Sequence, residues 1–285
     1  MLIRRNLLLF FKDRAQVFFS LLVVLINIML FVLFLGNTME DSFRAIVGDV
    51  EGLGAAVAGI ALAGMIALTS MSTSMGAMTT NITDKESGKI RDFLSSPYSR
   101  WKLLLSYTVS SSLIGILMSF AGILLSIVYL LSIGGEIPNI FLLILTTVLS
   151  VLCANSILFF ITIFVKSQGA FSAFISVIST LSGFLMGIYV PIDILPESVQ
   201  WVVRLFPMSH SAAMFRTIFA QDALEKIFSD LPSAYLENVK ESIGLVFNYN
   251  GFISNFWFSA GVLLVTIIVF YGLGLLAVTK GKSFV

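Results

Sequence analysis

Long apolar runs constrain what this chain can fold into more than any other feature of its sequence. A helix needs about 20 consecutive apolar residues to cross the hydrocarbon core of a bilayer. Hydrophobic residues make up 58% of the chain and charged residues 12%, against about 25% charged in soluble domains. We therefore expect an all-α polytopic membrane protein with six transmembrane helices, at residues 17–35, 53–79, 103–133, 139–165, 169–190 and 256–279.

The lysines and arginines of the connections predict the orientation of the chain. Cytoplasmic connections of membrane proteins are enriched in these residues. If both termini lie in the cytoplasm, the inner side receives most of the 17 basic residues, and the outer side keeps only Arg44, Arg204, Arg216, Lys226 and Lys240. We expect a multi-pass protein of the cell inner (plasma) membrane, with its N-terminus and C-terminus cytoplasmic.

The first 16 residues combine basic side chains with the apolar run Leu7–Phe11. This pattern fits an amphipathic helix lying in the cytoplasmic interface, and it fits a simple basic anchor equally well. The apolar run that follows, at 17–35, is too long for a cleaved signal peptide. We expect it to be retained as the first span.

Residues 191–255 form the one sizeable extramembrane region of this topology. Its first part, 191–219, is rich in apolar residues, and irregular backbone at membrane depth must be covered by protein or line a cavity. We expect two short amphipathic helices, broken at Pro207, that cap the bundle as an extracellular re-entrant lid. The second part, 222–250, is more acidic and predicts a helix over about residues 233–246.

The densest charge in the chain lies between the second and third apolar runs. It fills the stretch from Asp84 to Trp101, within a predicted cytoplasmic loop at 81–102. A charge at the bilayer centre costs roughly 2.5–3.5 kcal/mol, so the loop must face water. Charges that only fixed the topology would be basic, and the acidic Glu86 and Asp92 favour instead a short helix that docks on another protein.

This loop resembles the one that joins the second and third helices of type-2 ABC-transporter permeases. In that family an acidic residue, a glutamate and a glycine precede a Pro-x-Ser-Arg element, and the corresponding residues are Asp84, Glu86, Gly88, Pro97, Ser99 and Arg100. A second match follows the fifth run, at Pro191, Pro196, Pro207 and Arg216. One departure is Lys89, where many relatives have a small hydroxyl residue.

The resemblance implies that residues 1–285 form a single transmembrane permease domain, the membrane-spanning subunit of an ATP-driven ABC exporter. Separate ABC ATPase subunits would bind ATP and magnesium, and a second permease copy or similar permease would complete the transporter. The source would be bacterial, and the substrate an amphipathic or hydrophobic drug, peptide or lipid. The residues that would couple the ATPase to the bundle are Asp84, Glu86, Gly88, Lys89, Arg91, Phe93, Pro97 and Arg100. Those of the extracellular lid would be Pro191, Pro196, Pro207 and Arg216.

No site for nucleotide, metal or catalysis is visible in the sequence. Gly281-Lys282-Ser283 imitates the end of a P-loop, but Leu276 stands where the first glycine of that motif belongs. His210 is the only histidine and Cys153 the only cysteine. We expect no enzyme activity, no cofactor and no metal in this chain, no nucleic-acid partner, and contact with membrane lipid.

Two stripes of small residues recur at helical spacing in the second and fifth runs. Small faces let helices approach closely in lipid. The stripes predict either tight packing within the bundle or, as the resemblance implies, contact with a second permease copy across a central cavity. Their members are Gly59, Ala63, Ser70 and Ser74, followed by Ser176, Ser179, Gly183 and Gly187.

Two other classes of function compete with transport. An intramembrane enzyme needs ionisable residues within its spans, whereas the polar residues near the span centres are ones such as Asn27 and Asn155. A non-transporting membrane scaffold or immunity protein, which binds a toxin at the outer surface, is the remaining alternative. A neighbouring gene for a P-loop ATPase would favour the exporter over the scaffold.

Overall fold

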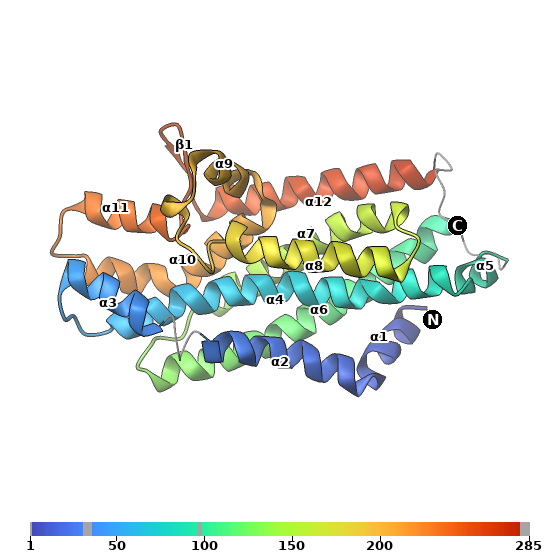
Figure 1. The fold of residues 1–285 in the computed structure, drawn as a ribbon, viewed down its shortest axis with the longest axis horizontal. Helices are drawn as coiled ribbons and strands as arrows, with labels where there is room; N and C mark the ends of the chain where they lie inside the picture. The colour runs from blue at the N-terminus through green and yellow to red at the C-terminus, as the bar shows by residue number, and fades with distance from the viewer. Residues whose placement is uncertain (1, 31–35, 96–98, 280–285) are drawn as a thin grey trace.

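The computed structural model describes residues 2–30, 36–95 and 99–279, and it is almost entirely helical. Figure 1 shows an elongated bundle in which the long helices run side by side. The helices are α1 (Leu2–Lys12), α2 (Arg14–Leu30), α3 (Gly36–Val47), α4 (Leu53–Glu86), α5 (Lys89–Leu94), α6 (Arg100–Ser132), α7 (Ile140–Phe164), α8 (Gln168–Leu185), the 3-10 turn η2 (Ile192–Ile194), α9 (Glu197–Leu205), α10 (Pro207–Ile227), α11 (Ser233–Ser242) and α12 (Phe256–Thr279). Strands β1 (Asn248–Tyr249) and β2 (Phe252–Ile253) form a short antiparallel hairpin.

Five helices of the described chain are long and apolar enough to cross a membrane: α4, α6, α7, α8 and α12. Together with the all-α fold they confirm a multi-pass membrane protein. The bounds of α12 are those predicted, and α8 ends at Leu185, five residues before the predicted end at 190. The predicted first span is covered by α2 up to Leu30, and the rest of it, residues 31–35, lies outside the described residues.

Helix α4 is the centre of the bundle and is buried along most of its length. It contacts α6, α7, α8 and α10. Helix α4 runs beyond the predicted span at 53–79 by two further turns, to Glu86. Thr83 donates its hydroxyl to the carbonyl of Thr79 within these turns, and the helix ends where Gly88 takes a positive φ of 77°. The predicted loop at 81–102 therefore begins within the helix.

Helix α10 is longer and more deeply placed than the predicted lid helix. The break at Pro207 is present, but α10 runs for 21 residues and packs along α4, α12 and α7. Small residues permit this contact: a Cβ at Gly59 would lie 2.6 Å from the carbonyl oxygen of Phe219. The expectation of two short helices above the bundle is thus wrong for the second helix, which is part of the bundle core.

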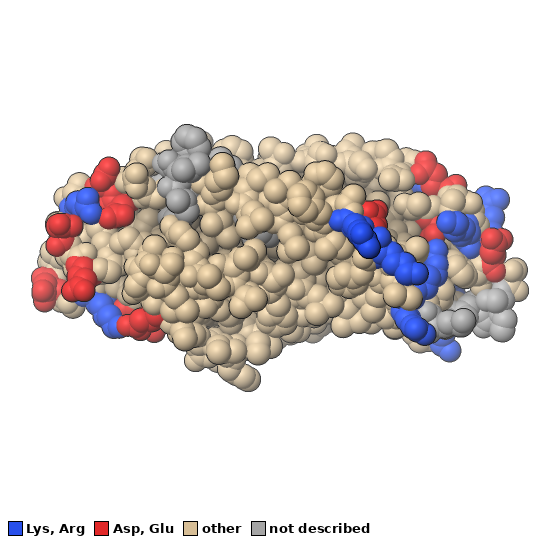
Figure 2. Space-filling view, turned by 90° about the horizontal axis from the view of Figure 1, so that it is seen from below, with Lys and Arg blue, Asp and Glu red and all other residues tan. Residues whose placement is uncertain are grey.

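Charged side chains gather at the two ends of the molecule, as Figure 2 shows, with a broad uncharged band between them. One end holds α3 and α11, and the other holds the N-terminus and α5 (Figure 1). Basic side chains dominate the view of the second end, which we therefore name the basic end; the first is named the acidic end. An uncharged band between charged ends suits a protein whose middle lies in hydrocarbon.

Candidate functional site

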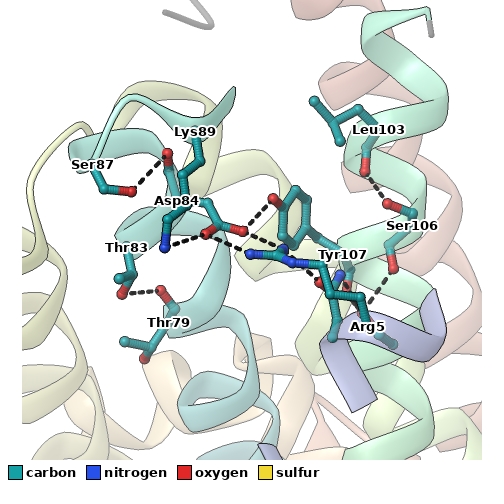
Figure 3. A network of polar contacts seen from close by, with 11 residues as sticks. Arg5, Thr79, Thr83, Asp84, Ser87, Lys89, Leu103, Ser106 and Tyr107 are labelled. Atoms are coloured by element: carbon teal, nitrogen blue, oxygen red, sulfur yellow. Dashed lines mark hydrogen bonds and ion pairs between the residues drawn. The ribbon is translucent and has the colours of Figure 1, made fainter. Parts of the chain in front are cut away.

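The candidate site lies at the basic end, where the last turn of α4 meets four other helices. Asp84 is its centre, with its side chain only 3% exposed. Its carboxylate accepts hydrogen bonds from Arg5 Nη1 at 2.6 Å, from Arg5 Nη2 at 3.0 Å and from the hydroxyl of Tyr107 at 2.6 Å. Lys89 Nζ lies 3.9 Å from Oδ1 of the same carboxylate, the oxygen that also accepts from Arg5 Nη2. Figure 3 shows these side chains converging from α1, α4, α6 and the start of α5.

Arg5 binds Asp84 through both terminal nitrogens, the geometry that makes arginine–carboxylate pairs strong and directional. The carboxylate raises the pKa of the Arg5 guanidinium above its ordinary value, so this cation stays charged at every physiological pH. The guanidinium also lies over the ring of Phe93, 5.3 Å from its centroid. The neighbouring Asn6 donates to the hydroxyl of Ser110 at 3.1 Å. Helix α1 is therefore joined to α4, α5 and α6.

The two residues after Asp84 contact two further helices. Lys85 donates from Nζ to the carbonyls of Thr162 and Val165 at the C-terminal end of α7, where a cation also meets the negative end of the helix dipole. Glu86 accepts the backbone N–H of Gln168 at 3.1 Å, at the first turn of α8. Three consecutive residues of α4 thus bind α1, α6, α7 and α8. We give the name inner junction to the set formed by Asp84, Lys85, Glu86, Arg5 and Tyr107.

Helix α5 extends the inner junction to the surface. Ile90 is buried against the chain's own core, and Phe93 is half-buried under Arg5. Arg91 and Asp92 are exposed. The apolar face of this helix therefore packs on the bundle, and the charged face is left for a partner.

The remaining predicted coupling residues are placed as follows. Gly88 supplies the left-handed turn between α4 and α5, and Arg100 is exposed in the first turn of α6. Pro97 lies outside the described residues. Among the residues that the structure does describe, no group of three or more His, Cys, Asp or Glu side chains stands ready to hold a metal ion.

Sequence reasoning found Asp84, Glu86 and Lys89 but missed Arg5, Lys85 and Tyr107. Arg5 lies 79 residues before Asp84 in the sequence, and no local pattern relates the two. A signal for such a pair did exist, since an acidic side chain on a buried helix must find a cationic or hydrogen-bonding partner. The sequence alone did not indicate which partner it was.

The predicted small-residue stripes have different surroundings in α4 and α8. In α4, Ser70 accepts a hydrogen bond from Ser119 and Ser74 accepts one from Asn155, so this stripe packs within the chain, as does Ala63. In α8, Ser176 is exposed and Ser179 half-buried. Gly183 and Gly187 lie at the end of α8, where Gly187 has a φ of 63°. Contact with a second copy stays a prediction, and α8 is the helix that leaves a face open for it.

Arg216, one of the predicted lid residues, is fully buried at the C-terminal end of another helix. Its Nη2 donates to the carbonyls of Met186 and Gly187, both at 2.8 Å, and Nη1 donates to the carbonyl of Gly244 at 3.3 Å. These carbonyls follow α8 and α11. We name Arg216 with these three carbonyls the outer junction. Pro191 directly precedes η2, and Pro196 directly precedes α9. Pro207 is the first residue of α10.

Comparison with protein families gives one result that bears on this geometry. The family model described as ABC-2 type transporter matches residues 1–220. The match includes the inner junction and Arg216. No curated protein sequence gives a significant match to the chain.

Proposed function

The chain belongs to the ABC-2 type transporter family and is a membrane subunit of an ABC transporter, and we propose that it serves an ATP-driven exporter. In this proposal ATP and magnesium are bound by separate ATPase subunits at the basic end of the bundle. The transported substrate is amphipathic or hydrophobic, such as a drug, a peptide or a lipid. Family membership implies association with ABC ATPase subunits; the direction of transport and the substrate class belong to the proposal.

The inner junction is the single observation that carries this proposal. A force applied to α5 meets Asp84, Lys85 and Glu86 within one helical turn, and these side chains hold α1, α6, α7 and α8. Charge-assisted hydrogen bonds of this kind are about twice as strong as neutral ones. A docked ATPase would therefore move several helices together rather than bend one loop.

The exposed charges of α5 indicate how a partner would dock. Arg91 and Asp92 are exposed and face away from the buried Ile90. Charged rims of interfaces chiefly set the association rate and the specificity of binding. We expect the ATPase to present complementary charges to this short helix.

A second permease copy is the other partner in the proposal. The open face of α8 carries Ser176, Val177 and Leu181, which are exposed in the single chain. Small and apolar side chains on a lipid-facing helix suit close helix contact.

With N-terminus and C-terminus inside, as the basic connections predict, the acidic end lies outside the cell. No observation favours the scaffold or immunity alternative.

The test is co-purification of the chain in detergent with a candidate ABC ATPase subunit from the same organism. We expect a stable complex with wild type and a weakened one with Arg91→Glu, which reverses an exposed charge of α5. Arg44→Glu is the matched control, because Arg44 is exposed on α3 at the opposite end. Failure of any ATPase to associate with wild type would overturn the exporter proposal.

A second variant separates docking from coupling. Glu86→Gln keeps the size of the side chain but weakens its bond to the N–H of Gln168. We expect this variant to bind the ATPase normally and to lose ATP-dependent transport of substrate in vesicles. Transport at the wild-type rate would show that the inner junction does not carry the motion.

A further inference from the structure

A cavity of about 500 Å³ lies toward the acidic end, away from the inner junction. Three segments distant in sequence line this half-open cavity: α3, the turn at 187–191 after α8, and the end of α11. Its floor includes Ile60 of α4. Cavities that hold small ligands in proteins measure about 300–1,000 Å³, so this one has the volume for a ligand.

The lining of this cavity is apolar and uncharged. Met39, Phe43 and Ile46 form the wall from α3, and Ile188 and Ile243 form parts of the other two walls. The polar groups are hydroxyls, among them those of Ser42, Tyr189 and Ser242, and no charged side chain is among the described residues that line it. An ionic ligand would lose its hydration here without a compensating charge, at a cost of several kcal/mol. The chemistry therefore favours a neutral, largely apolar ligand with one or two hydrogen-bonding groups.

Two walls of the cavity are fixed by the outer junction. Gly187 and Gly244 both take positive φ, of 63° and 67°. Each lies in a turn that ends a helix, in which N–H groups after the helix donate to carbonyls of the last helical turn. Arg216 then donates to the carbonyls at both turns from behind the walls. A cation at two helix C-termini is also favoured by the helix dipoles. The walls that follow α8 and α11 are thus held in place, and α3 packs beside them through the buried Phe43.

From these observations we infer that the cavity between α3, the turn at 187–191 and the end of α11 binds a neutral, largely apolar small molecule or acyl chain. Ser42 and Ser242 lie at opposite walls and supply hydroxyls to the ligand's polar group. The inference names a site separate from the ATPase-coupling junction, and binding there does not depend on the proposed function. If the chain exports its substrate, this site is a place where the substrate rests near the outer side.

The test is protection of single cysteines from a thiol reagent. The background is Cys153→Ala, which removes the only cysteine of the chain, and the test positions are Ser42→Cys and Ser242→Cys. Ser229→Cys is the matched control, because Ser229 is exposed outside the cavity. The uncharged probe is N-phenyl-1-naphthylamine, added to the purified chain in detergent without any ATPase. The rate at which N-ethylmaleimide modifies each introduced cysteine is measured with and without the probe.

We expect the probe to slow modification at positions 42 and 242 by about tenfold when its concentration is about ten times its dissociation constant. Modification at position 229 should be unchanged. The anionic analogue 1-anilinonaphthalene-8-sulfonate should protect much less. Absence of protection at both cavity positions, equal protection at position 229, or equal protection by the anionic analogue would each overturn the inference.

A filling variant and a change of surroundings complete the experiment. Ile46→Trp places a larger ring at the half-exposed rim of the cavity and should abolish protection, whereas Ile194→Trp, at an exposed position outside it, should not. Protection at position 42 by phospholipid nanodiscs alone would identify an acyl chain as the occupant. Protection only by the added probe would identify a small molecule. Since no ATPase is present, failure here is distinct from failure of the exporter proposal.

Discussion

Each end of the bundle has an arginine that joins segments distant in sequence, and the two arginines bind in different ways. Arg5 at the basic end is partly exposed, and its partners are the carboxylate of Asp84 and the ring of Phe93. Arg216 toward the acidic end is fully buried, and its partners are backbone carbonyls at the ends of α8 and α11. Among the described residues, no acidic side chain forms an ion pair with Arg216.

The difference between these partners bears on what each junction can do. The Arg5 side chain reaches solvent, so water can solvate its guanidinium when the pair opens, and Asp84 keeps the Tyr107 hydroxyl as a donor. Carbonyls that receive a buried guanidinium have no such substitute, and an unsatisfied buried polar group is costly. We therefore interpret the inner junction as the part that moves and the outer junction as the part that holds its shape.

The largest effect is expected from Arg216→Met. The variant leaves the buried carbonyls of Met186 and Gly244, and the partly buried carbonyl of Gly187, without their donor. An unsatisfied buried polar group costs about 1–3 kcal/mol, so the free energy of unfolding should fall by about 3 kcal/mol. Unfolding in detergent, followed by circular dichroism, measures it. Arg44→Met, which removes the exposed surface pairs with Glu40, Asp41 and Asp49, is the control and should change stability by less than about 1 kcal/mol. Equal stability of the two variants would show that the hydrogen bonds of Arg216 do not stabilise the fold.

The next effect is a coupling energy between Arg5 and Asp84. Arg5→Met, Asp84→Asn and the double variant form a thermodynamic cycle, and contacting charges give coupling energies of roughly 0.5–3 kcal/mol. We expect a favourable value within this range from unfolding free energies. We also expect each single variant to lower transport more than it lowers ATPase binding. Additive single effects would mean that the two side chains are neighbours without being partners.

A smaller effect is expected where a glycine turn supports the outer junction. Gly187 has a φ of 63°, and a side chain in this left-handed region costs about 1–2 kcal/mol. Gly187→Ala should lower the unfolding free energy by that amount and should also weaken probe binding in the cavity. Gly76→Ala, within α4 and with open space at its Cβ, should instead be neutral or slightly stabilising. A neutral Gly187→Ala would show that the turn is free to change shape.

The smallest effect is expected at Lys89, the second cation beside Asp84. Its Nζ lies 3.9 Å from the carboxylate and its side chain is 56% exposed, and exposed pairs of this kind contribute about 0–1 kcal/mol. Lys89→Ser introduces the small hydroxyl residue that many type-2 permeases have at this position. The variant should therefore leave the thermal midpoint of unfolding within the scatter of replicate curves. A clear loss would mean that Lys89 and Arg5 hold Asp84 jointly.

The apolar spans were predictable because each depends on local composition. The run at 256–279 became α12 with the same bounds, since hydropathy alone decides where such a helix lies. Helix α4 passed its predicted end at 79 because tertiary contacts of Asp84 and Lys85 stabilise polar turns that hydropathy places in a loop. The family resemblance read from the loop and from the fifth run is confirmed by the family match.

The inner and outer junctions were predictable only in part. Asp84 and Arg216 stood out as charged residues within motifs, but their partners are side chains and carbonyls from other helices. Helix α3 was missed because its polar residues, such as Glu40 and Asp41, suggested a loop, although Phe43 packs in the core. Helix α10 was predicted to be part of a lid; its burial within the bundle depends on neighbours such as Gly59.

The length of α4 has a mechanical consequence for the whole molecule. At a rise of about 1.5 Å per residue its 34 residues span about 51 Å, whereas the hydrocarbon core of a bilayer measures about 30 Å. The helix is therefore a lever that emerges from the membrane, with the inner junction at one tip and the floor of the apolar cavity toward the other (Figure 1). A tilt of about 10° would displace one tip by about 9 Å relative to the other. A rigid tilt that moved one tip at one surface of the membrane would thus also move the other tip at the opposite surface.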